Sequence, residues 1–421
     1  MSEREYLTMD DFELTGKVVL ARVDLNSPID PMSGEFLDDR RIQSHAKTLK
    51  ELSHKGARVV VLAHQGRPGD EYEFTTLAKH AKHLEKIMGI KVKYTDELFS
   101  ESAVKGIKAM KNGEVLVLEN LRFNAEEMLE RPPDAQTKAH LVRGLAPHAD
   151  YYLNDAFAAA HRSQPSLVGF MPLLPSFSGR VMELELDMLS KVIKDPKRPD
   201  IPKRPSIFML GGSKAEDSLK VVDKALSNGS ADKILTTGLV ALIFLIAKGY
   251  DLGQPTYEFL VGKKLDKQIS YAKELLSKFP DKIELPVDLA VSKQGKRVEV
   301  QLAELPLPYK VSDIGSGTIG RYKYVLDQAG TILANGPAGY FESREFAKGT
   351  HDLLAAMAAN KEAFTIVSGG HLATAAEQMK VSDKLSHVST GGGAAILLLA
   401  GERLPVIEAL KAAAKRHKGL K

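Results

Sequence analysis

The 421-residue sequence contains no cysteine. This absence excludes disulfides, thiolate-bound metal ions and a thiol nucleophile. No stretch approaches the roughly 18 consecutive apolar residues of a membrane-spanning helix. The most apolar window, GLVALIFLIAKGY at 238–250, predicts a buried helix instead. The first residues, MSEREYLTMDDFEL, are charged and lack an apolar core, so we expect no signal peptide and a cytoplasmic location without membrane attachment.

A strong charge of either sign is also missing, since 58 Lys and Arg residues oppose 54 Asp and Glu residues. A net charge of +4 is too small to favour nucleic-acid binding, although it suits small anionic ligands. Several catalytic signatures are absent: the P-loop, the protein-kinase motifs, a serine nucleophile elbow and HExxH. A G-x-G-x-x-G pattern occurs at 315–320, but no clear strand precedes it and no ribose-binding acid follows about 20 residues later, which disfavours a dinucleotide-dependent oxidoreductase.

Short runs of Val, Ile and Leu alternate along the chain with helix-like stretches such as 75–88 and 266–279. Such runs are typical of strands buried on both faces, and their alternation with helices predicts an α/β fold with mostly parallel sheets. Four prolines in the segment 195–205 break both helix and sheet. We therefore expect an N-terminal domain over 1–180, an interdomain helix and proline-rich linker over 181–205, and a C-terminal domain over 206–403, each of the two domains containing a doubly wound sheet.

Ligands of open α/β sheets bind beyond the carboxyl ends of the strands, so the residues after each apolar run carry most information. In the first half these residues are largely basic, and Asp24 and Asn26 accompany them. The basic residues are Arg40, Arg41, His64, Arg67, Arg122, His161 and Arg162. Arginine presents a planar fork that suits carboxylate and phosphate oxygens, so the set predicts a cup for a small polyanion. A metal site at the histidines is not favoured, because no carboxylate or third histidine lies at ligand spacing.

In the second half the expected strands end in glycines: GGSK, TTGL, DIGSG, ANGPAG, SGGH and STGGGA. Glycine lets a phosphate or an adenine approach the backbone closely, and a following helix N-terminus supplies N–H donors. Glu342 follows one of these segments and is a candidate acceptor for ribose hydroxyls. One half therefore predicts anion binding and the other nucleotide binding, an arrangement that suits transfer between two substrates with closure that excludes water.

Taken in order, these strand ends resemble the phosphoglycerate kinase family over residues 17–405. The matching segments are RVDLNSP, DDRRI, AHQGRP, LENLRF, NDAFAAAHR, LGGSK, LPVD, DIG, NGPAGYFE, FAKGT, SHVSTGGGA and a late LP. The resemblance implies two Rossmann-like domains joined by a hinge, and a segment 404–421 that returns to the N-terminal domain. It also implies a glycolytic and gluconeogenic enzyme that interconverts 1,3-bisphosphoglycerate plus ADP and 3-phosphoglycerate plus ATP.

The resemblance further implies roles for individual residues. Those expected at 3-phosphoglycerate are Asp24, Asn26, Arg41, His64, Arg67, Arg122 and Arg162. Those expected around ADP or ATP are Gly212, Lys214, Gly238, Gly315, Asn335, Pro337, Glu342, Ser368, Gly369, Gly370, His371, Gly391, Gly392 and Gly393. The residues expected at the transferring phosphoryl group are Arg41, Lys214, Gly369 and Gly392. Direct in-line transfer on closure, with Mg²⁺ on the nucleotide, is the implied mechanism; a monomer is expected, with a dimer as the alternative.

Two departures from the family pattern resemble its archaeal branch. Ser218 stands where many members have a second lysine, and the nearest lysine is Lys220. His371 stands where an aspartate helps to hold the metal, and a neutral imidazole is a poor ligand for a hard cation, so the Mg²⁺ ligands stay unassigned. These departures keep open one alternative, a non-catalytic relative that only binds nucleotide.

Overall fold

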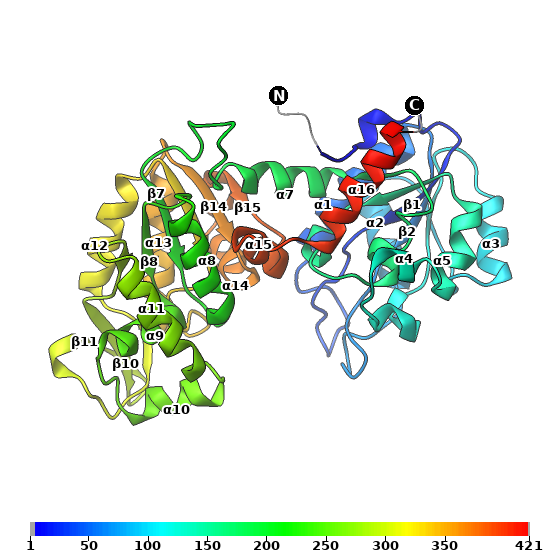
Figure 1. Ribbon diagram of the computed structural model, residues 1–421. Helices are drawn as coiled ribbons and strands as arrows, with labels where there is room; N and C mark the ends of the chain where they lie inside the picture. Colours follow the sequence, from blue (N-terminus) through cyan, green and yellow to red (C-terminus); the bar gives the residue numbers. More distant parts are fainter. Residues whose placement is uncertain (1–4, 420–421) are drawn as a thin grey trace. The chain divides into compact units, whose positions relative to one another are not determined.

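The computed structural model describes residues 5–419, and these divide into two compact units (Figure 1). Unit 1 contains the chain up to Leu186 and again from Arg403 onwards, and unit 2 contains Asp187–Glu402. The boundary falls inside helix α7 (Arg180–Ser190). Within the described residues, no helix combines the length and the apolar character that crossing a membrane requires.

Unit 1 is built on a six-stranded parallel sheet in the order β3-β4-β2-β1-β5-β6. Its strands are β1 (Val18–Arg22), β2 (Arg58–Leu62), β3 (Val92–Tyr94), β4 (Val115–Val117), β5 (Tyr151–Asn154) and β6 (Ser176–Ser178). In the central register Leu20 of β1 pairs with Val60 of β2 and with Tyr152 of β5. All five residues of β1 are buried, which explains why its sequence shows no polar alternation.

Helices pack against this sheet and complete the core of unit 1 (Figure 1). The α-helices are α1 (Arg40–His54), α2 (Ala78–Met88), α3 (Glu101–Lys108), α4 (Pro133–Gln136), α5 (His140–Leu145), α6 (Pro165–Val168), the first part of α7, and α16 (Pro405–Gly419). The 3₁₀ helices are η1 (Met9–Asp11), η2 (Leu121–Phe123), η3 (Ala125–Met128), η4 (Ala146–His148) and η5 (Phe157–Ala159). The final helix α16 contacts β6 and α6, although it lies more than 200 residues later in the chain.

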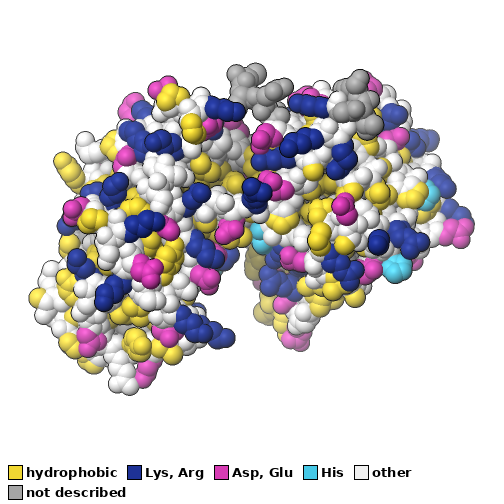
Figure 2. Space-filling view, in the orientation of Figure 1, with side chains coloured by type: hydrophobic (Ala, Val, Ile, Leu, Met, Phe, Trp, Pro, Cys, Tyr) yellow, Lys and Arg dark blue, Asp and Glu magenta, His cyan; other side chains and the backbone are white. Residues whose placement is uncertain are grey.

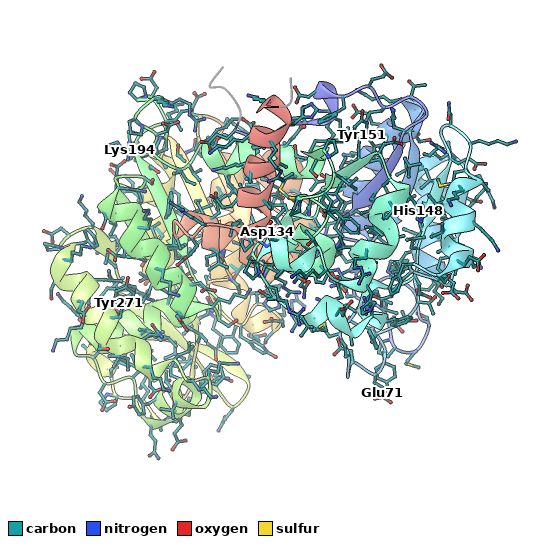
Figure 3. The ribbon with its side chains drawn as sticks, turned by 45° about the vertical axis from the view of Figure 1, so that its right-hand side comes forward. Glu71, Asp134, His148, Tyr151, Lys194 and Tyr271 are labelled. Carbon is teal, nitrogen blue, oxygen red and sulfur yellow. The ribbon has the colours of Figure 1, made fainter. Side chains whose placement is uncertain are left out.

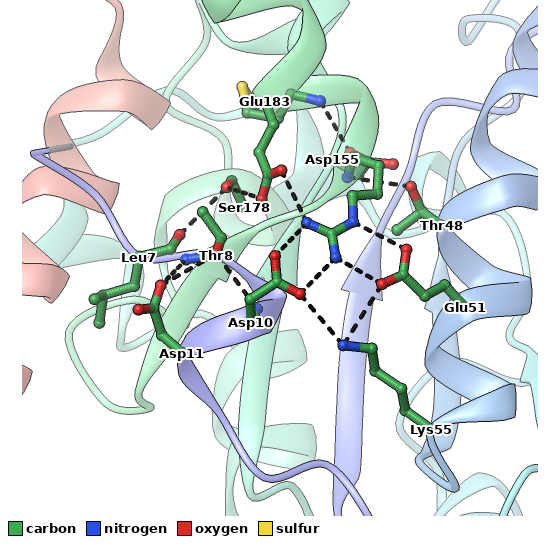
Figure 4. Close-up of polar contacts among 12 residues, drawn as sticks. Leu7, Thr8, Asp10, Asp11, Thr48, Glu51, Lys55, Asp155, Ser178 and Glu183 are labelled. Carbon is green, nitrogen blue, oxygen red and sulfur yellow. Dashed lines mark hydrogen bonds and ion pairs between the residues drawn. The ribbon is translucent and has the colours of Figure 1, made fainter. Parts of the chain in front are cut away.

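An ion-pair network ties the start of the chain to α1 and α7 (Figure 4). The guanidinium of Arg180 lies 2.7 Å from Asp10, 2.6 Å from Glu51 and 3.0 Å from Glu183. The hydrogen bonds that Arg180 donates to these carboxylates raise its pKa further, so the charge is permanent. Tyr151 begins β5 (Figure 3), and its ring centre lies 5.0 Å from that of Phe12.

Unit 2 has its own six-stranded parallel sheet, in the order β15-β14-β13-β7-β8-β9. Its strands are β7 (Ser206–Leu210), β8 (Lys233–Thr236), β9 (Ile283–Glu284), β13 (Thr331–Asn335), β14 (Phe364–Ser368) and β15 (His387–Val388). The α-helices are α8 (Ala215–Ser227), α9 (Gly238–Lys248), α10 (Gln254–Gly262), α11 (Ile269–Lys278), α12 (Ser316–Asp327), α13 (Lys348–Ala359), α14 (Gly370–Gln378) and α15 (Gly392–Leu399). The 3₁₀ helices are η6 (Asp266–Gln268), η7 (Leu302–Glu304), η8 (Arg344–Phe346) and η9 (Ser382–Lys384).

The expected α/β class with parallel sheets is therefore confirmed, with one addition in unit 2. A three-stranded antiparallel sheet, β11-β10-β12, lies beside the parallel sheet. Its strands are β10 (Asp288–Lys293), β11 (Lys296–Gln301) and β12 (Val311–Ile314). The run KIELPVDLAV looks like one strand in the sequence, but it divides around Pro286 into β9 and β10, because proline cannot donate to a strand ladder.

The proline-rich segment 195–205 belongs to unit 2. Arg204 forms an ion pair of 2.9 Å with Asp232, and Lys203 donates to the carbonyl of Glu362 at 2.7 Å. The interdomain helix and linker expected over 181–205 stay a prediction. The prolines exclude helix and sheet there, as expected, but they do not prevent side chains from anchoring the segment to its neighbours.

Candidate functional site

Polar and basic residues of unit 1 gather at the carboxyl ends of β1, β2, β4 and β5, as the sequence predicts. Arg41, from the first turn of α1, lies 3.0 Å from the carboxylate of Asp24, which follows β1. It also donates to the carbonyl of Asn26 at 3.2 Å. The neighbouring Arg40 pairs with Asp38 instead. The structure thus pairs Arg41 with the aspartate that follows β1.

The carboxylate of Asp24 is an integral part of this cup. Its burial would by itself raise the pKa, but the charges of Arg41 and Arg22 outweigh burial and hold the pKa well below its usual range. The side-chain oxygen of Asn26 accepts the backbone N–H of Gly66 at 2.8 Å, which joins the ends of β1 and β2. Both residues therefore order the loops, and Asp24 orients the guanidinium of Arg41.

Several arginines lie close enough to repel one another. Burial lowers the pKa of Arg122 to about 10, and the charges of Arg162, Arg22 and Arg67 add to this effect. Arg122 also donates to the carbonyl of Gly66. Burial also lowers the pKa of Arg162, and the charge of Arg67 adds a smaller effect in the same direction. At neutral pH all of these groups stay charged, so a bound polyanion would relieve their repulsion.

A second site lies in unit 2, where the loops after β7, β8 and β13 are joined by backbone hydrogen bonds. Gly211 donates to Asn335 at 2.8 Å, Gly212 to Pro337 at 3.0 Å, and Gly238 to Ala338 at 2.9 Å. Gly238 has a φ of +52°, and a Cβ there would lie 2.7 Å from the nitrogen of Gly212. The glycines are therefore required for the contact between loops, apart from any ligand.

A pocket of about 420 Å³ opens beside these loops. Its apolar lining consists of Leu239, Ala241, Leu242, Phe259, Leu289, Val311, Ile314 and Ala338. Its charged and polar lining consists of Ser213, Lys263, Lys310, Ser312, Asp313, Tyr340, Glu342 and His371. A mostly apolar pocket of this size with a few polar groups at its edge suits a small ligand with a flat ring.

Five of the residues predicted around the nucleotide line this pocket: Gly212, Gly238, Pro337, Glu342 and His371. Most of its apolar lining, such as Leu242 on α9 and Phe259 on α10, is not identified by the sequence argument. The run GLVALIFLIAK predicts only a buried helix, since nothing in it indicates which side faces a pocket. Lys310 lies 4.5 Å from the ring centre of Phe259, a contact that joins distant parts of the chain.

The other predicted residues lie at neighbouring strand ends rather than in the pocket wall. Lys214 is the residue directly before α8, and its side chain is exposed and forms no ion pair within the described residues. Ser368, at the end of β14, is fully buried, and its hydroxyl has no hydrogen-bond partner among the described residues. Gly369 and Gly370 lead into α14, and Gly391, Gly392 and Gly393 begin α15. Helix N-termini carry N–H groups that lack partners within the helix.

Gly315, which is also predicted at the nucleotide, does not line the pocket, and its role at the nucleotide stays a prediction. It begins α12, and a Cβ at Gly315 would lie 2.5 Å from a carboxylate oxygen of Asp288. The carboxylate of Asp288 accepts the N–H groups of Gly317 and Thr318 at 2.8 and 2.7 Å. The G-x-G-x-x-G pattern at 315–320 thus serves the capping of α12 by a buried aspartate, and Gly315 does not line the pocket.

The structure shows the surroundings of the two residues that depart from the family pattern, Ser218 and His371. Ser218 is completely buried in α8, and its hydroxyl has no partner among the described residues. Lys220 lies on α8 at 3.5 Å from Glu216, so it is engaged in an ion pair within the helix. The imidazole Nδ1 of His371 lies 3.9 Å from Glu342, at the edge of the pocket. Within residues 5–419 no three acidic or histidine side chains converge to hold a metal ion.

Comparison with known proteins agrees with this architecture. The model of the family described as phosphoglycerate kinase matches residues 9–402. The phosphoglycerate kinase of Methanothermus fervidus is 48% identical and covers 98% of both chains, and that of Methanothermobacter thermautotrophicus is 49% identical over 97% of both. The crystal structure of phosphoglycerate kinase from Pyrococcus horikoshii superimposes with a TM-score of 0.90 at 40% identity, covering 97% of this chain and all of that one.

Two parallel α/β units, an arginine-rich cup and a pocket lined by glycine loops define an enzyme that transfers phosphoryl groups. With this degree of similarity over its whole length, the chain belongs to the phosphoglycerate kinase family.

Proposed function

We propose that the chain transfers a phosphoryl group reversibly between 1,3-bisphosphoglycerate and ADP, giving 3-phosphoglycerate and ATP in glycolysis and gluconeogenesis. The observation that carries the proposal is that two different kinds of binding site lie in different units. Guanidinium groups gather at the strand ends of unit 1, and a largely apolar pocket lies between glycine loops in unit 2. Figure 2 shows basic and acidic side chains interspersed over the visible face of each unit, as expected from the small net charge.

The phosphoglycerate is assigned to unit 1. Its anionic groups would bind Arg41, Arg67, Arg122 and Arg162, together with His64, while Asp24 and Asn26 order the cup. Arg41 is the residue assigned to the transferring group, because its guanidinium is half-exposed and is already oriented by Asp24. The glycerate carboxylate is an anionic nucleophile, so the transfer needs no general base, and the protein contributes positioning and charge neutralisation.

The nucleotide is assigned to unit 2. The base would occupy the apolar pocket, Glu342 would accept from the ribose, and the phosphates would lie along Lys214, the Ser368–Gly370 turn and residues 391–393. Lys214 is free to contact the transferring phosphoryl, and the amides at Gly369 and Gly392 are assigned to its oxygens. Closure of the two units around both substrates would exclude water during direct in-line transfer.

Mg²⁺ would accompany the nucleotide, where it supplies charge neutralisation on the phosphates. The oxygen donors at the strand ends, namely the amide of Asn335, the unpartnered hydroxyl of Ser368 and the carboxylate of Glu342, suit a hard cation. They do not form a closed cage, so the residues fit an ion held mainly by phosphates and water. His371 would act on this ion only through Glu342. We further propose a monomeric, cytoplasmic enzyme.

The direct test is ATP- and Mg²⁺-dependent phosphorylation of 3-phosphoglycerate, coupled to an NADH-consuming step that removes the product. Arg41→Ala and Lys214→Ala should each lower kcat by about 10²- to 10³-fold, because each removes one cation from the transition state. The chain offers matched controls in Arg40→Ala and Lys220→Ala, whose side chains pair with Asp38 and Glu216 and should leave the rate nearly unchanged.

Two results would contradict the proposal. A Lys214→Ala enzyme with near-normal kcat would remove Lys214 from the transferring group. No turnover in the unmodified chain across several divalent metals and temperatures, with nucleotide still bound, would favour the non-catalytic relative. In that case Ser218 and His371 would be the first positions to change to lysine and aspartate.

A further inference from the structure

A buried chain of hydrogen bonds lies beneath the arginine-rich cup of unit 1. It joins Arg22 at the end of β1, Ser166 in α6 and Glu127 in η3, whose exposed fractions are 1%, 0% and 1%. Arg22 Nε donates to Ser166 Oγ at 2.9 Å, and the hydroxyl of Ser166 in turn donates to Glu127. The backbone N–H of Ser166 donates to the second oxygen of Glu127 at 3.1 Å. Burial raises the pKa of Glu127, while the charge of Arg22 and the hydrogen bonds from Ser166 oppose that rise. One bridging hydroxyl thus joins the carboxyl group of Glu127 to the guanidinium of Arg22.

The other end of this chain is His64. Arg22 Nη2 lies 3.1 Å from His64 Nδ1. A guanidinium has only N–H donors, carries no acceptor and stays protonated, so Nδ1 must be the acceptor. The imidazole proton then resides on Nε2. Among the described residues Nε2 of His64 has no hydrogen-bond partner, so a single donor remains available after β2.

The surroundings of His64 keep its ring neutral. Burial and the charge of Arg22 on β1 lower its pKa, as do Arg122 on η2 and Arg162 after η5, while the Asp24 carboxylate after β1 opposes them. The resulting pKa lies well below the ordinary value of about 6.5. A neutral imidazole among these arginines contributes a directed N–H hydrogen-bond donor and no charge.

We propose that Glu127 is a positioning residue of the phosphoglycerate site: through Ser166 and Arg22 it fixes His64 as the neutral Nε2–H tautomer, which donates one hydrogen bond to the bound substrate. The identity of that substrate rests on the proposed function. Tyr152 supports the relay, since its hydroxyl donates to the carbonyl of Ser166 at 2.7 Å and holds α6 in place. A purely structural ion pair would stabilise the unit but would leave His64 and substrate affinity unaffected.

The tautomer can be measured without substrate. In protein labelled with ¹⁵N-histidine, the signals of His64 are assigned by their loss in His64→Gln. We expect a protonated, pyrrole-type Nε2 and an unprotonated, pyridine-type Nδ1, unchanged as the pH passes through about 6.5. A ring protonated on Nδ1, or a ring that titrates near that pH, would overturn the assignment.

The positioning role is measured by a double-mutant cycle. Glu127→Gln and Ser166→Ala should each raise KM for 3-phosphoglycerate about tenfold, with KM for ATP within about twofold of the unmodified enzyme. In a His64→Gln background neither change should raise KM further, because both act through His64. If Glu127→Gln does not fold, Ser166→Ala alone tests the positioning role, because it leaves the buried side chains of Glu127 and Arg22 in place.

A matched control is Ser176→Ala, which removes another buried hydroxyl of unit 1; among residues 5–419 this hydroxyl donates to the carbonyl of Leu174 alone. It should leave both KM values unchanged. Additive effects of Ser166→Ala and His64→Gln, or equal changes in both KM values, would overturn the positioning role while turnover itself persists. Absence of turnover in the unmodified enzyme would instead refute the proposed function, and the tautomer measurement would still test the inference.

Discussion

Gly336 lies where the loops after β7 and β13 approach each other closely, and its replacement by alanine has a calculable cost. Its φ is +79°, a conformation that costs an alanine about 1–2 kcal/mol. The added Cβ would lie 2.5 Å from the oxygen, 2.6 Å from the carbon of Gly211, and 2.8 Å from the nitrogen of Gly212. All three are backbone atoms, so no side chain can rotate away and the loops must separate.

Separation of the loops would break the hydrogen bonds from Gly211 to Asn335 and from Gly212 to Pro337. Each is worth about 0.5–1.5 kcal/mol, so we expect Gly336→Ala to destabilise unit 2 by roughly 2–5 kcal/mol in all. The same change should weaken ATP binding, because Gly212 and Pro337 line the pocket. Native-state hydrogen exchange of the β7 and β13 amides measures the local opening free energy directly.

The control is Gly295→Ala in the same unit. Gly295 has nearly the same φ, +76°, but a Cβ there meets no atom within 4 Å. Its cost should therefore be the conformational part alone, about 1–2 kcal/mol, with ATP binding unchanged. Equal destabilisation by the two substitutions would refute the reasoning, because it would show that the approach of the loops contributes nothing.

Three further predictions concern charged groups. The hydrogen bond from Arg180 lowers the pKa of Asp10 from 3.8 to about 2. The ionised Asp10 therefore stabilises the fold above pH 4, and this stabilisation is lost as the pH falls towards 2. Arg180→Met should remove this part of the acid dependence of the unfolding midpoint. Asp313→Asn should cost about 1–3 kcal/mol in urea unfolding, because it removes the charge of a buried carboxylate that lies 2.7 Å from Arg297, while Arg297 keeps its ion pair with Glu299. His371→Asp should lower the Mg²⁺ concentration that gives the half-maximal rate, since it adds an oxygen ligand at the pocket edge.

Each of these predictions has a clear contrary outcome. An acid limb that is identical with and without Arg180 would show that the network does not hold Asp10 ionised. For the buried pair, Asp352→Asn is the control, because its ion pair with Lys348 is half-exposed and should contribute less than about 1 kcal/mol. An unchanged Mg²⁺ requirement in His371→Asp would separate residue 371 from the metal.

The sequence predicts the fold well because parallel α/β structure has a strong local signature. Strands buried on both faces need uninterrupted Val, Ile and Leu, and the glycines after them permit tight turns into the next helix. Segments such as ARVVVLAHQGRP therefore identify both β2 and the position of His64 and Arg67 at its end. The residues at the strand ends of unit 1 are accessible to the same argument, since topology alone brings them to one edge.

Local patterns do less well where a partner is distant. The antiparallel sheet of unit 2 depends on pairing between β10 and β12. The need for a glycine at position 315 is explained only by the contact with Asp288, which precedes Gly315 by 27 residues. The apolar wall of the pocket is contributed mainly by α9, α10, β10 and β12, whose apolar residues are indistinguishable in sequence from ordinary core. Apolar periodicity shows that a side chain is buried but not what it faces.

By itself the sequence determined the two α/β halves, the cations after the first set of strands and the glycines after the second, because these follow from burial and turn chemistry read locally. The folded structure was needed to show that Arg41 contacts Asp24, that Gly315 packs against Asp288, and that Glu127 and Ser166 lie behind Arg22 and His64. Those relations depend on charge balance and hydrogen bonding inside a buried volume, where the partner is chosen by the folded path of the chain rather than by its neighbours in sequence.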